Sequence, residues 1–469
     1  IQMTLPPNLR KLNIEVTLGS VGFISEEMVN LEYLLLKLPN IQSFDKTGIN
    51  APNLKKLVLE CESLSNFDGL KQFPYLKHLE FSEVSFSMSL FDDGSFSELD
   101  TFICWGCDIQ NTVDFDSSLL TFPSNLKQLS IEFYDSVIVN LNNLMLPPTL
   151  TRLTLLDLSF NDGYFHLGEN LQYVHIETST LRFNSSFKIP HLAGELILEA
   201  DYLTFDSPEI MYHLPNSLTR LQLIANKKGK MSPFIRKIKW PLVLGDFAFK
   251  NFSIDYHTLE LLNLKESILE VIYIRGGNIK KLNVDLFPVS VKNLTLMEMG
   301  IHELSASFES LKNLYRLSLM GNQLRNVNSV KLPVSSLEVL NVRQCNLRLI
   351  SPFLVSMLEE KNQNANLRVE ATGNLNVNIN DARKVMKAIK GLSLELNRLN
   401  DSILKISNHS YRLEAVYRDF DPYFETPQSS ETEEVVSDYD SDDLYNGSVF
   451  YLDEEYSDDE DDDNKRKKN

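Results

Sequence analysis

Apolar residues return along the chain at a nearly constant interval. The motif Leu-x-x-Leu-x-Leu recurs, and its middle apolar residue is found at Leu12, Leu34, Leu57, Leu79, Phe102, Leu129, Leu153, Val174, Leu196, Leu221, Phe247, Ile272, Leu294, Leu317 and Leu340. The mean interval is about 23 residues, within the range of short solenoid repeats. A second apolar row follows five residues after the last apolar strand residue, for example at Leu64 and Leu324. Two apolar rows in one phase predict about 15 to 16 repeats, each with a short strand and a returning segment.

A single repeat of this kind cannot bury its own apolar residues. Stacked repeats share one continuous core, and their strands form a parallel sheet that lines the concave side. Burying one Leu side chain contributes about 1.5–3 kcal/mol. Pro residues precede many strands, as at Pro52, Pro148 and Pro215, and fix φ where the chain turns into the strand. We therefore expect an α/β solenoid, a curved horseshoe, over residues 1–374.

The repeat resembles that of the leucine-rich-repeat superfamily over roughly residues 5–370, with the pattern LxxLxLxxNxL. In that family an Asn three residues after the last strand leucine bonds the backbone of the turn. Asn226 and Asn322 match this position, and Cys107 and Cys345 are the accepted alternative. The other repeats depart from the pattern, so we expect an irregular solenoid. The sequence is similar to fungal-type irregular leucine-rich-repeat proteins, some of which are F-box substrate receptors in ubiquitin ligases.

After Asn374 the apolar spacing changes to that of a helix. With Asp381 as the expected N-cap, apolar residues follow in steps of three and four at Val385, Ile389, Leu392, Leu396, Leu399, Ile403 and Ile406. We interpret residues 375–418 as a helical cap over the last repeat. The alternative is a dimerising coiled coil, but three heptads are short for a stable zipper, so we favour the cap and a monomer.

The net charge of −19 is unevenly distributed. Residues 425–469 hold 17 acidic and 4 basic side chains, a net of −13, so residues 1–424 have a net charge of only −6. Such a body lacks the surplus of Lys and Arg that binds phosphates, and we expect no nucleic-acid partner. Residues 419–469 are rich in Asp, Glu, Ser and Tyr and poor in aliphatic side chains, which predicts a disordered acidic tail with a basic C-terminus.

The predicted tail contains two kinds of candidate signal. Three serines have an acidic residue three positions later, a spacing that resembles acidophilic casein-kinase sites: Ser430, Ser437 and Ser457. The basic end is either a nuclear-import signal or a short solubilising end: Lys465, Arg466, Lys467 and Lys468. No apolar run is long enough for a membrane span, and four cysteines are too few for a disulfide framework. We expect no membrane contact and an intracellular protein, cytoplasmic, nuclear or both.

The sequence contains no recognisable catalytic or metal-binding motif: HExxH, GxSxG, GxxxxGK and GxGxxG are all missing. Cys104 and Cys107 form a CxxC pair, but they occupy an inward strand position and the Asn/Cys position of the repeat. This placement favours a role in the core over redox chemistry. We therefore expect neither an enzyme nor a bound cofactor.

Candidate binding residues follow from the alternation of side chains along a strand. The positions between the inward residues face the concave side, and the row after the last strand leucine is mostly acidic up to Glu199 and basic or apolar beyond it. We expect a protein partner on this face, with the anchors Trp105, Tyr173, Tyr273 and Met320, because aromatic side chains contribute strongly to interfaces. The other predicted contacts are Glu132, His175, Glu177, Glu199, Arg275 and Arg343.

Two functional classes remain open. The first is a non-enzymatic scaffold or recognition module, which the resemblance extends to the substrate-binding part of an F-box/leucine-rich-repeat receptor. A repeat begins at Leu5 and the chain starts at Ile1 without Met, so we expect a fragment, and an F-box would have to precede Ile1. The alternative is a nuclear regulator whose acidic tail binds basic proteins such as histones. That arrangement resembles the acidic leucine-rich nuclear phosphoproteins and the GTPase-activating protein for Ran.

Overall fold

The computed structural model describes residues 2–16, 22–24, 27–91, 94, 96–109, 122–141, 144–161, 163–305, 307–324, 330–359, 366–389 and 392–396. All of them belong to one compact unit, Ile1–Asn408. The predicted acidic tail, its three candidate serines and the basic end at 465–468 lie outside the described residues, as does the part of the apolar stripe from Leu399 onwards.

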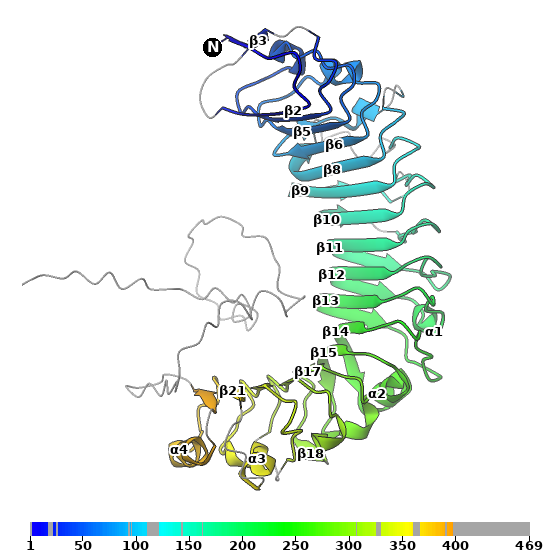
Figure 1. Ribbon diagram of the computed structural model, residues 1–469. Helices are drawn as coiled ribbons and strands as arrows, with labels where there is room; N and C mark the ends of the chain where they lie inside the picture. Colours follow the sequence, from blue (N-terminus) through cyan, green and yellow to red (C-terminus); the bar gives the residue numbers. More distant parts are fainter. Residues whose placement is uncertain are drawn as a thin grey trace, which may run out of the picture. The chain divides into compact units, whose positions relative to one another are not determined.

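One long parallel sheet runs through the described unit, and each of its strands comes from a separate repeat (Figure 1). Neighbours in the sequence are neighbours in the sheet, as a solenoid requires. The predicted fold class is confirmed. In order, the strands are β2 (Lys11–Glu15), β4 (Tyr33–Lys37), β5 (Lys56–Glu60), β6 (His78–Ser82), β8 (Thr101–Ile109), β9 (Gln128–Val139), β10 (Arg152–Phe160), β11 (Tyr173–Phe183), β12 (Glu195–Phe205), β13 (Arg220–Met231), β14 (Asp246–Asp255), β15 (Val271–Asn278), β17 (Asn293–Met297), β19 (Arg316–Ser318), β20 (Val339–Asn341), β21 (Arg368–Glu370) and β22 (Ser393–Glu395).

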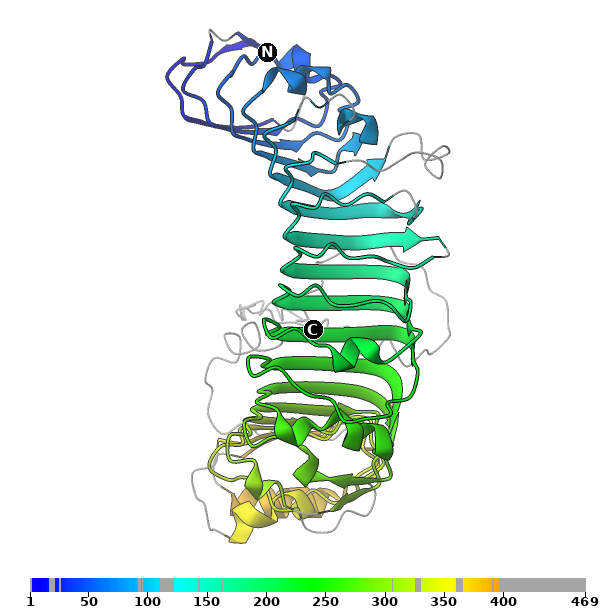
Figure 2. The same ribbon diagram turned by 90° about the vertical axis from the view of Figure 1, so that its right-hand side faces the viewer.

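The returning segments contain short helices and strands. In the region of β13 and β14, α1 and α2 lie on the convex side of the sheet (Figures 1 and 2). The remaining strands are β1 (Gln2–Thr4), β3 (Gly22–Ile24), β7 (Ser85–Phe86), β16 (Lys281–Asn283) and β18 (Glu303–Ser305). The α-helices are α1 (Glu209–Tyr212), α2 (Tyr256–Leu262), α3 (Val355–Glu359) and α4 (Ile379–Ala388). The 3-10 helices are η1 (Phe44–Thr47), η2 (Asp68–Gln72), η3 (Met88–Phe91), η5 (Leu264–Glu266), η6 (Val284–Leu286), η7 (Phe308–Ser310) and η8 (Ser351–Phe353).

The predicted apolar row forms the centre of the core. Every member of the row from Leu34 to Leu340 is fully buried. The sheet register pairs each member with its counterpart in the next strand, for example Leu57 with Leu79 and Leu294 with Leu317. Parallel strands lie about 4.8 Å apart, so these side chains pack directly on one another along the whole stack. The in-phase packing predicted from the sequence is confirmed.

The strands in the middle of the stack are longer than the predicted repeat strand. In β10 and β12 the pairing register shifts after the inner residues, between Leu155 and Leu158 and between Ala200 and Tyr202. Each strand then continues as a second limb whose apolar residues join the core. The extra residue in β10 is Asp157, which has a φ of 56°. Asp tolerates this left-handed conformation better than most residues, so a bulge replaces the turn here.

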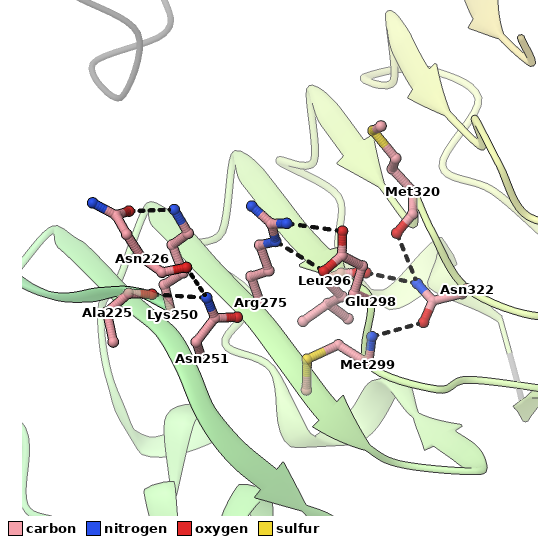
Figure 3. A network of polar contacts seen from close by, with 10 residues as sticks. All are labelled: Ala225, Asn226, Lys250, Asn251, Arg275, Leu296, Glu298, Met299, Met320 and Asn322. Carbon is pink, nitrogen blue, oxygen red and sulfur yellow. Dashed lines mark hydrogen bonds and ion pairs between the residues drawn. The ribbon is translucent and has the colours of Figure 1, made fainter. Parts of the chain in front are cut away.

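Asn322 makes the hydrogen bonds that the family pattern predicts (Figure 3). Its Oδ1 accepts from the backbone N–H groups of Met299 and Ile301, at 3.0 and 3.1 Å. Its Nδ2 donates to the carbonyl oxygens of Leu296 and Leu319, at 2.8 and 2.7 Å. The side chain is fully buried, so it satisfies backbone groups of two repeats that water cannot reach.

The prediction for Asn226 is wrong. β13 continues through this residue, so the turn that the amide would bond is replaced by strand. The Asn226 side chain lies on the concave side instead, where it contacts Glu199 and Lys250. Asn374, which the sequence analysis did not assign, makes the same four bonds as Asn322, with Oδ1 accepting at 2.9 Å from both Cys345 N and Leu347 N.

The described part of the predicted cap, residues 375–418, does not form one continuous helix. After α4 the chain enters β22, where Leu394 pairs with Val369 of β21, so the sheet extends beyond the predicted boundary at residue 374. Alternation of buried and half-buried side chains around Leu394 fits a strand rather than a helix. The outer domain boundary and the capping role of the segment stay predictions.

Asn378, and not the predicted Asp381, is the N-cap of α4. Its side chain accepts hydrogen bonds from the backbone N–H groups of Asn380 and Asp381. The Asp381 carboxylate instead accepts from the N–H groups of Ile350 and Ser351, at 2.7 and 3.0 Å. This bond ties α4 to the start of η8, which a search for local capping patterns does not detect.

Replacing Asn322 with Ala will destabilise the fold far more than the same change at Asn226. Asn322→Ala leaves two buried N–H groups and two buried carbonyl oxygens without their partner, which costs about 3 kcal/mol or more. Asn226→Ala removes only partly exposed contacts, worth less than about 1 kcal/mol. Urea denaturation followed by circular dichroism measures both; equal losses would contradict the assigned roles.

Candidate protein-binding surface

Strands β8 to β12 bring six of the predicted contact residues into neighbouring positions on the concave face. The register places Glu177 beside Glu199 and Glu132 beside Leu156. Trp105 follows Cys104, which pairs with Ile131 just before Glu132. The six residues are partly buried and lie on consecutive or alternate strands: Trp105, Glu132, Tyr173, His175, Glu177 and Glu199.

Four carboxylates gather at the centre of this region, and we call Glu132, Asp157, Glu177 and Glu199 the acidic patch. Burial, followed by the charges of the other three carboxylates, raises the pKa of Glu177 to about 7. Burial, followed by the charge of Asp157, also raises the pKa of Glu132. The patch therefore holds negative charge in a place where that charge is unfavourable for the protein alone.

Asp157 is not among the contact residues that the sequence predicts. Its place in the patch depends on the bulge in β10, which turns the residue out between the inward Leu155 and Leu158. The sequence signal is the break in alternation at Leu156-Asp157-Leu158, where an acidic residue stands out of phase. A strict two-residue period does not predict which way such a residue points.

Tyr173 and His175 lie beside Glu177 on the same face of β11. The Arg152 guanidinium carbon is 4.4 Å from the centroid of the Tyr173 ring, a cation–π contact that holds the ring in place. Burial raises the pKa of Tyr173 and lowers the pKa of His175, so both side chains are neutral near pH 7. They supply rigid, partly apolar surface next to the acidic patch.

Polar side chains connect the acidic patch to cationic residues on the following strands, and Figure 3 shows the Asn226–Lys250 and Arg275–Glu298 contacts of this network. Asn226 Nδ2 donates to Glu199 at 3.0 Å, and Asn226 Oδ1 accepts from Lys250 Nζ at 2.7 Å. One strand further, Arg275 donates to both oxygens of Glu298, at 2.9 and 3.1 Å. The sign of the charge along this row changes between β12 and β14, as the sequence predicted.

The predicted residues nearer the C-terminus do not form an exposed surface of the same kind. Met320 and Arg275 are each only 8% exposed, so the expectation of an exposed Met320 anchor is wrong. The concave-row residues Ser318 and Asn341 are buried as well. Tyr273 and Arg343 remain partly exposed, and the Arg343 Nε donates to Thr372 Oγ1 at 2.7 Å. These residues lie several strands away from the acidic patch.

The two cysteines of the CxxC pair are fully buried. Burial, followed by the neighbouring Cys107, raises the pKa of the Cys104 thiol well above its usual range, which opposes formation of a reactive thiolate. In the part of the chain that the structure describes, no group of three or more His, Cys, Asp or Glu side chains is arranged to hold a metal ion. Within the same residues, no helix is both long enough and apolar enough to cross a membrane.

Comparison with known proteins finds similarity in structure alone. No protein-family model matches the chain, and no curated protein sequence matches it. A leucine-rich-repeat protein of Leptospira interrogans superposes with a TM-score of 0.48 and 16% identity, covering 84% of this chain and 92% of that one. YopM from Yersinia enterocolitica superposes with a TM-score of 0.47 and 16% identity, covering 71% of this chain and 69% of that one. The plant peptide hormone receptor RGFR1, in complex with RGF2, superposes with a TM-score of 0.41 and 13% identity, covering 85% of this chain and 82% of that one.

These resemblances are too distant to indicate what the chain binds. The assignment of the fold rests on the chain itself: a fully buried apolar row in register, parallel strands from successive repeats, and the matching hydrogen bonds of Asn322 and Asn374. By these features, the described part of the chain is a leucine-rich-repeat solenoid.

Proposed function

We propose that the chain is a non-enzymatic recognition module that binds a protein partner on its concave face. The acidic patch is the observation that carries the proposal. A carboxylate with a pKa near 7 is held beside other carboxylates, and Lys or Arg from a partner would relieve the repulsion between them. The partner is therefore a protein segment with positive charge opposite strands β9 to β12.

Aromatic side chains provide the apolar part of the proposed interface. Trp105 and Tyr173 flank the acidic patch, and Tyr273 lies beyond the change of sign. Buried aromatic contacts supply most of the affinity at many interfaces, while charges mainly set orientation and association rate. The arrangement favours a partner that lies across several strands with its basic residues towards β9 to β12.

The finer form of the proposal is that the concave face binds the substrate of an F-box/leucine-rich-repeat ubiquitin-ligase receptor. Its support is the short, irregular repeat and its similarity to fungal-type proteins. A monomer of intracellular location is part of this proposal. Sequencing the gene upstream of the codon for Ile1 tests this proposal. An F-box helix pair encoded there would support the receptor, and an unrelated domain there would contradict the receptor assignment.

Loss of the aromatic anchors will weaken partner binding without unfolding the chain. Proteins that cross-link to the wild-type chain are first identified by mass spectrometry and then used as ligands. The double change Trp105→Ala/Tyr273→Ala should lower the affinity of the chain for such a ligand at least tenfold, about 1.4 kcal/mol. Tyr75→Ala/Tyr202→Ala is the matched control, because these exposed tyrosines are outside the predicted contact row. Unchanged affinity in the first variant would exclude the concave face.

Stability should depend on pH through Glu177. The pKa of Glu177 is 4.5 in the unfolded chain and about 7 in the folded one, so the folded state holds the proton more tightly. The contribution of this carboxyl to the free energy of unfolding is therefore fully present below pH 4.5 and is lost as the pH rises through 7. Glu177→Gln should therefore be more stable than the wild type at pH 8, on the order of 1–2 kcal/mol, with little difference at pH 4.5. Urea titrations at both pH values, with the exposed Glu62→Gln as control, measure this. A gap that does not widen with pH would contradict the electrostatic account.

A second candidate function rests on the charge of residues 425–469, which have a net charge of −13. We propose as the alternative that this segment binds basic proteins such as histones, as in nuclear regulators with acidic tails. Deleting residues 425–469 should abolish retention on immobilised histones, whereas Trp105→Ala/Tyr273→Ala should not change it. Retention that survives the deletion would remove this alternative.

A further inference from the structure

A cavity of about 630 Å³ lies beside the start of α2, a helix on the convex side of the sheet (Figure 1). Its lining comes from two successive repeats and consists of Tyr256, Asn278, Lys280, Lys281 and Asn283. Tyr256 is the first residue of α2, and the other four lie between the end of β15 and the end of β16. The volume is within the range of cavities that hold small molecules. We call it the convex cavity.

The core beneath the convex cavity fixes the position of its lining. The register of β14 and β15 brings the residue before Tyr256 opposite Asn278. Ile279 and Leu282, on either side of the two lysines, are fully buried. β16 is held in turn by its parallel pairing with β18. Such a surface loses little conformational freedom when a ligand binds.

The charge of the lining is positive. Among the described residues that line the cavity, two are lysines and none is Asp or Glu. Lys280 Nζ has no ion pair with any described residue, and Lys281 Nζ has one, with Glu303 at 3.8 Å. Both side chains of that pair are mostly exposed, so the pair holds the ammonium group only weakly. Both positive charges are therefore available to a ligand.

The other lining groups favour a ligand with several acceptor oxygens. Asn283 Oδ1 accepts from the Asp285 N–H at 3.1 Å, which leaves Nδ2 of this amide as a donor. The Asn278 amide and the Tyr256 hydroxyl make no hydrogen bond with any described residue. The Tyr256 side chain is 38% exposed, so its ring adds an apolar wall. Ammonium and amide donors beside a ring suit the oxygens and the organic part of a phosphate ester.

We propose that the convex cavity binds a phosphate ester. The ammonium groups of Lys280 and Lys281 bind the dianionic phosphate, and the amides of Asn278 and Asn283 donate to its oxygens. The organic part of the ester packs against the Tyr256 ring. A free small molecule and a phosphorylated side chain of another protein both supply this chemistry. The proposal does not depend on the partner of the concave face, because the convex cavity lies on other repeats and another face.

A carboxylate or a nucleic acid suits the convex cavity less well. A carboxylate carries a single charge and would leave the second ammonium group without a partner. A nucleic acid presents a continuous row of phosphates. That row would meet Asp285 and Glu303, which border the cavity through their contacts with Asn283 and Lys281.

Solubility is a different role for exposed lysines. It requires no particular arrangement of the side chains around them. The convex cavity combines two adjacent lysines with two amides and a phenol ring around one space. The two roles differ in a measurable property, since a solubilising lysine can be exchanged for one elsewhere and a ligand-binding lysine cannot.

The test is isothermal titration calorimetry of the full chain with phenyl phosphate at about 0.15 M salt. Lys280→Gln/Lys281→Gln should weaken binding at least tenfold, because it removes both cations that bind the phosphate. Lys237→Gln/Lys239→Gln removes the same charge at exposed positions outside the lining and should leave the Kd within twofold. Circular dichroism checks that the variants fold. If the first does not, Lys280→Gln alone replaces it, with an expected loss of at least threefold.

Further ligands separate the parts of the proposal and the two sources. Phenyl phosphate should bind more tightly than inorganic phosphate, and Tyr256→Ala should weaken the binding of the ester while leaving that of inorganic phosphate unchanged. A pentapeptide with a central phosphotyrosine among glycines is the second ester. Tighter binding of the peptide than of phenyl phosphate would support a phosphorylated protein as the source, and the reverse order would support a free small ester.

Three results would overturn the proposal. The first is that neither phenyl phosphate nor the phosphopeptide binds the wild type. The second is an equal Kd for phenyl phosphate in the wild type and in Lys280→Gln/Lys281→Gln. The third is that benzoate or a thymidine oligonucleotide binds as tightly as the esters and loses affinity in the same variant, which would indicate attraction of any anion.

Discussion

The structure depends on contact between equivalent apolar side chains of successive repeats. One repeat presents a strand of about five residues, too few to exclude water from its own leucines. When Leu57 lies on Leu79, and each of these on the next, the row loses its exposure completely. The spacing of the strands follows from backbone hydrogen bonds, so one register serves both interactions. A repeat can vary in length and in its returning segment, but it cannot shift the phase of this row.

The same constraint explains why the middle of the stack departs from the regular repeat. Where an Asn such as Asn322 bonds the turn, the strand stops after the inner residues. Strands β9 to β13 lack this bond and continue into a second limb, with register shifts in three of their four pairings, and the second apolar row is buried by strand pairing instead. The bulge places Asp157 on the surface, beside the other carboxylates of the acidic patch. The proposed binding surface on the concave face therefore lies where the repeat is irregular.

The apolar row, the parallel order of the strands and the change of charge along the concave face were all predictable from the sequence, because they depend on period alone. Asn226 shows the limit of that reasoning: it has the right residue at the right position, but its role required a turn that the structure replaces with strand. Met320 shows another limit, since alternation assigns it to the concave face correctly and yet neighbouring strands bury it. Asp157 and the link between Asp381 and Ile350 depend on bulges and contacts between repeats, which no local pattern contains.

The charge of the acidic patch depends on where the patch lies in the fold. Its carboxylates lie on the inner limbs of β9 to β12, where burial and the neighbouring carboxylates raise the pKa of Glu177. Salt screens charges in such a half-buried position less than charges on the open surface. Binding at the concave face should accordingly respond to pH through Glu177 more strongly than to ionic strength.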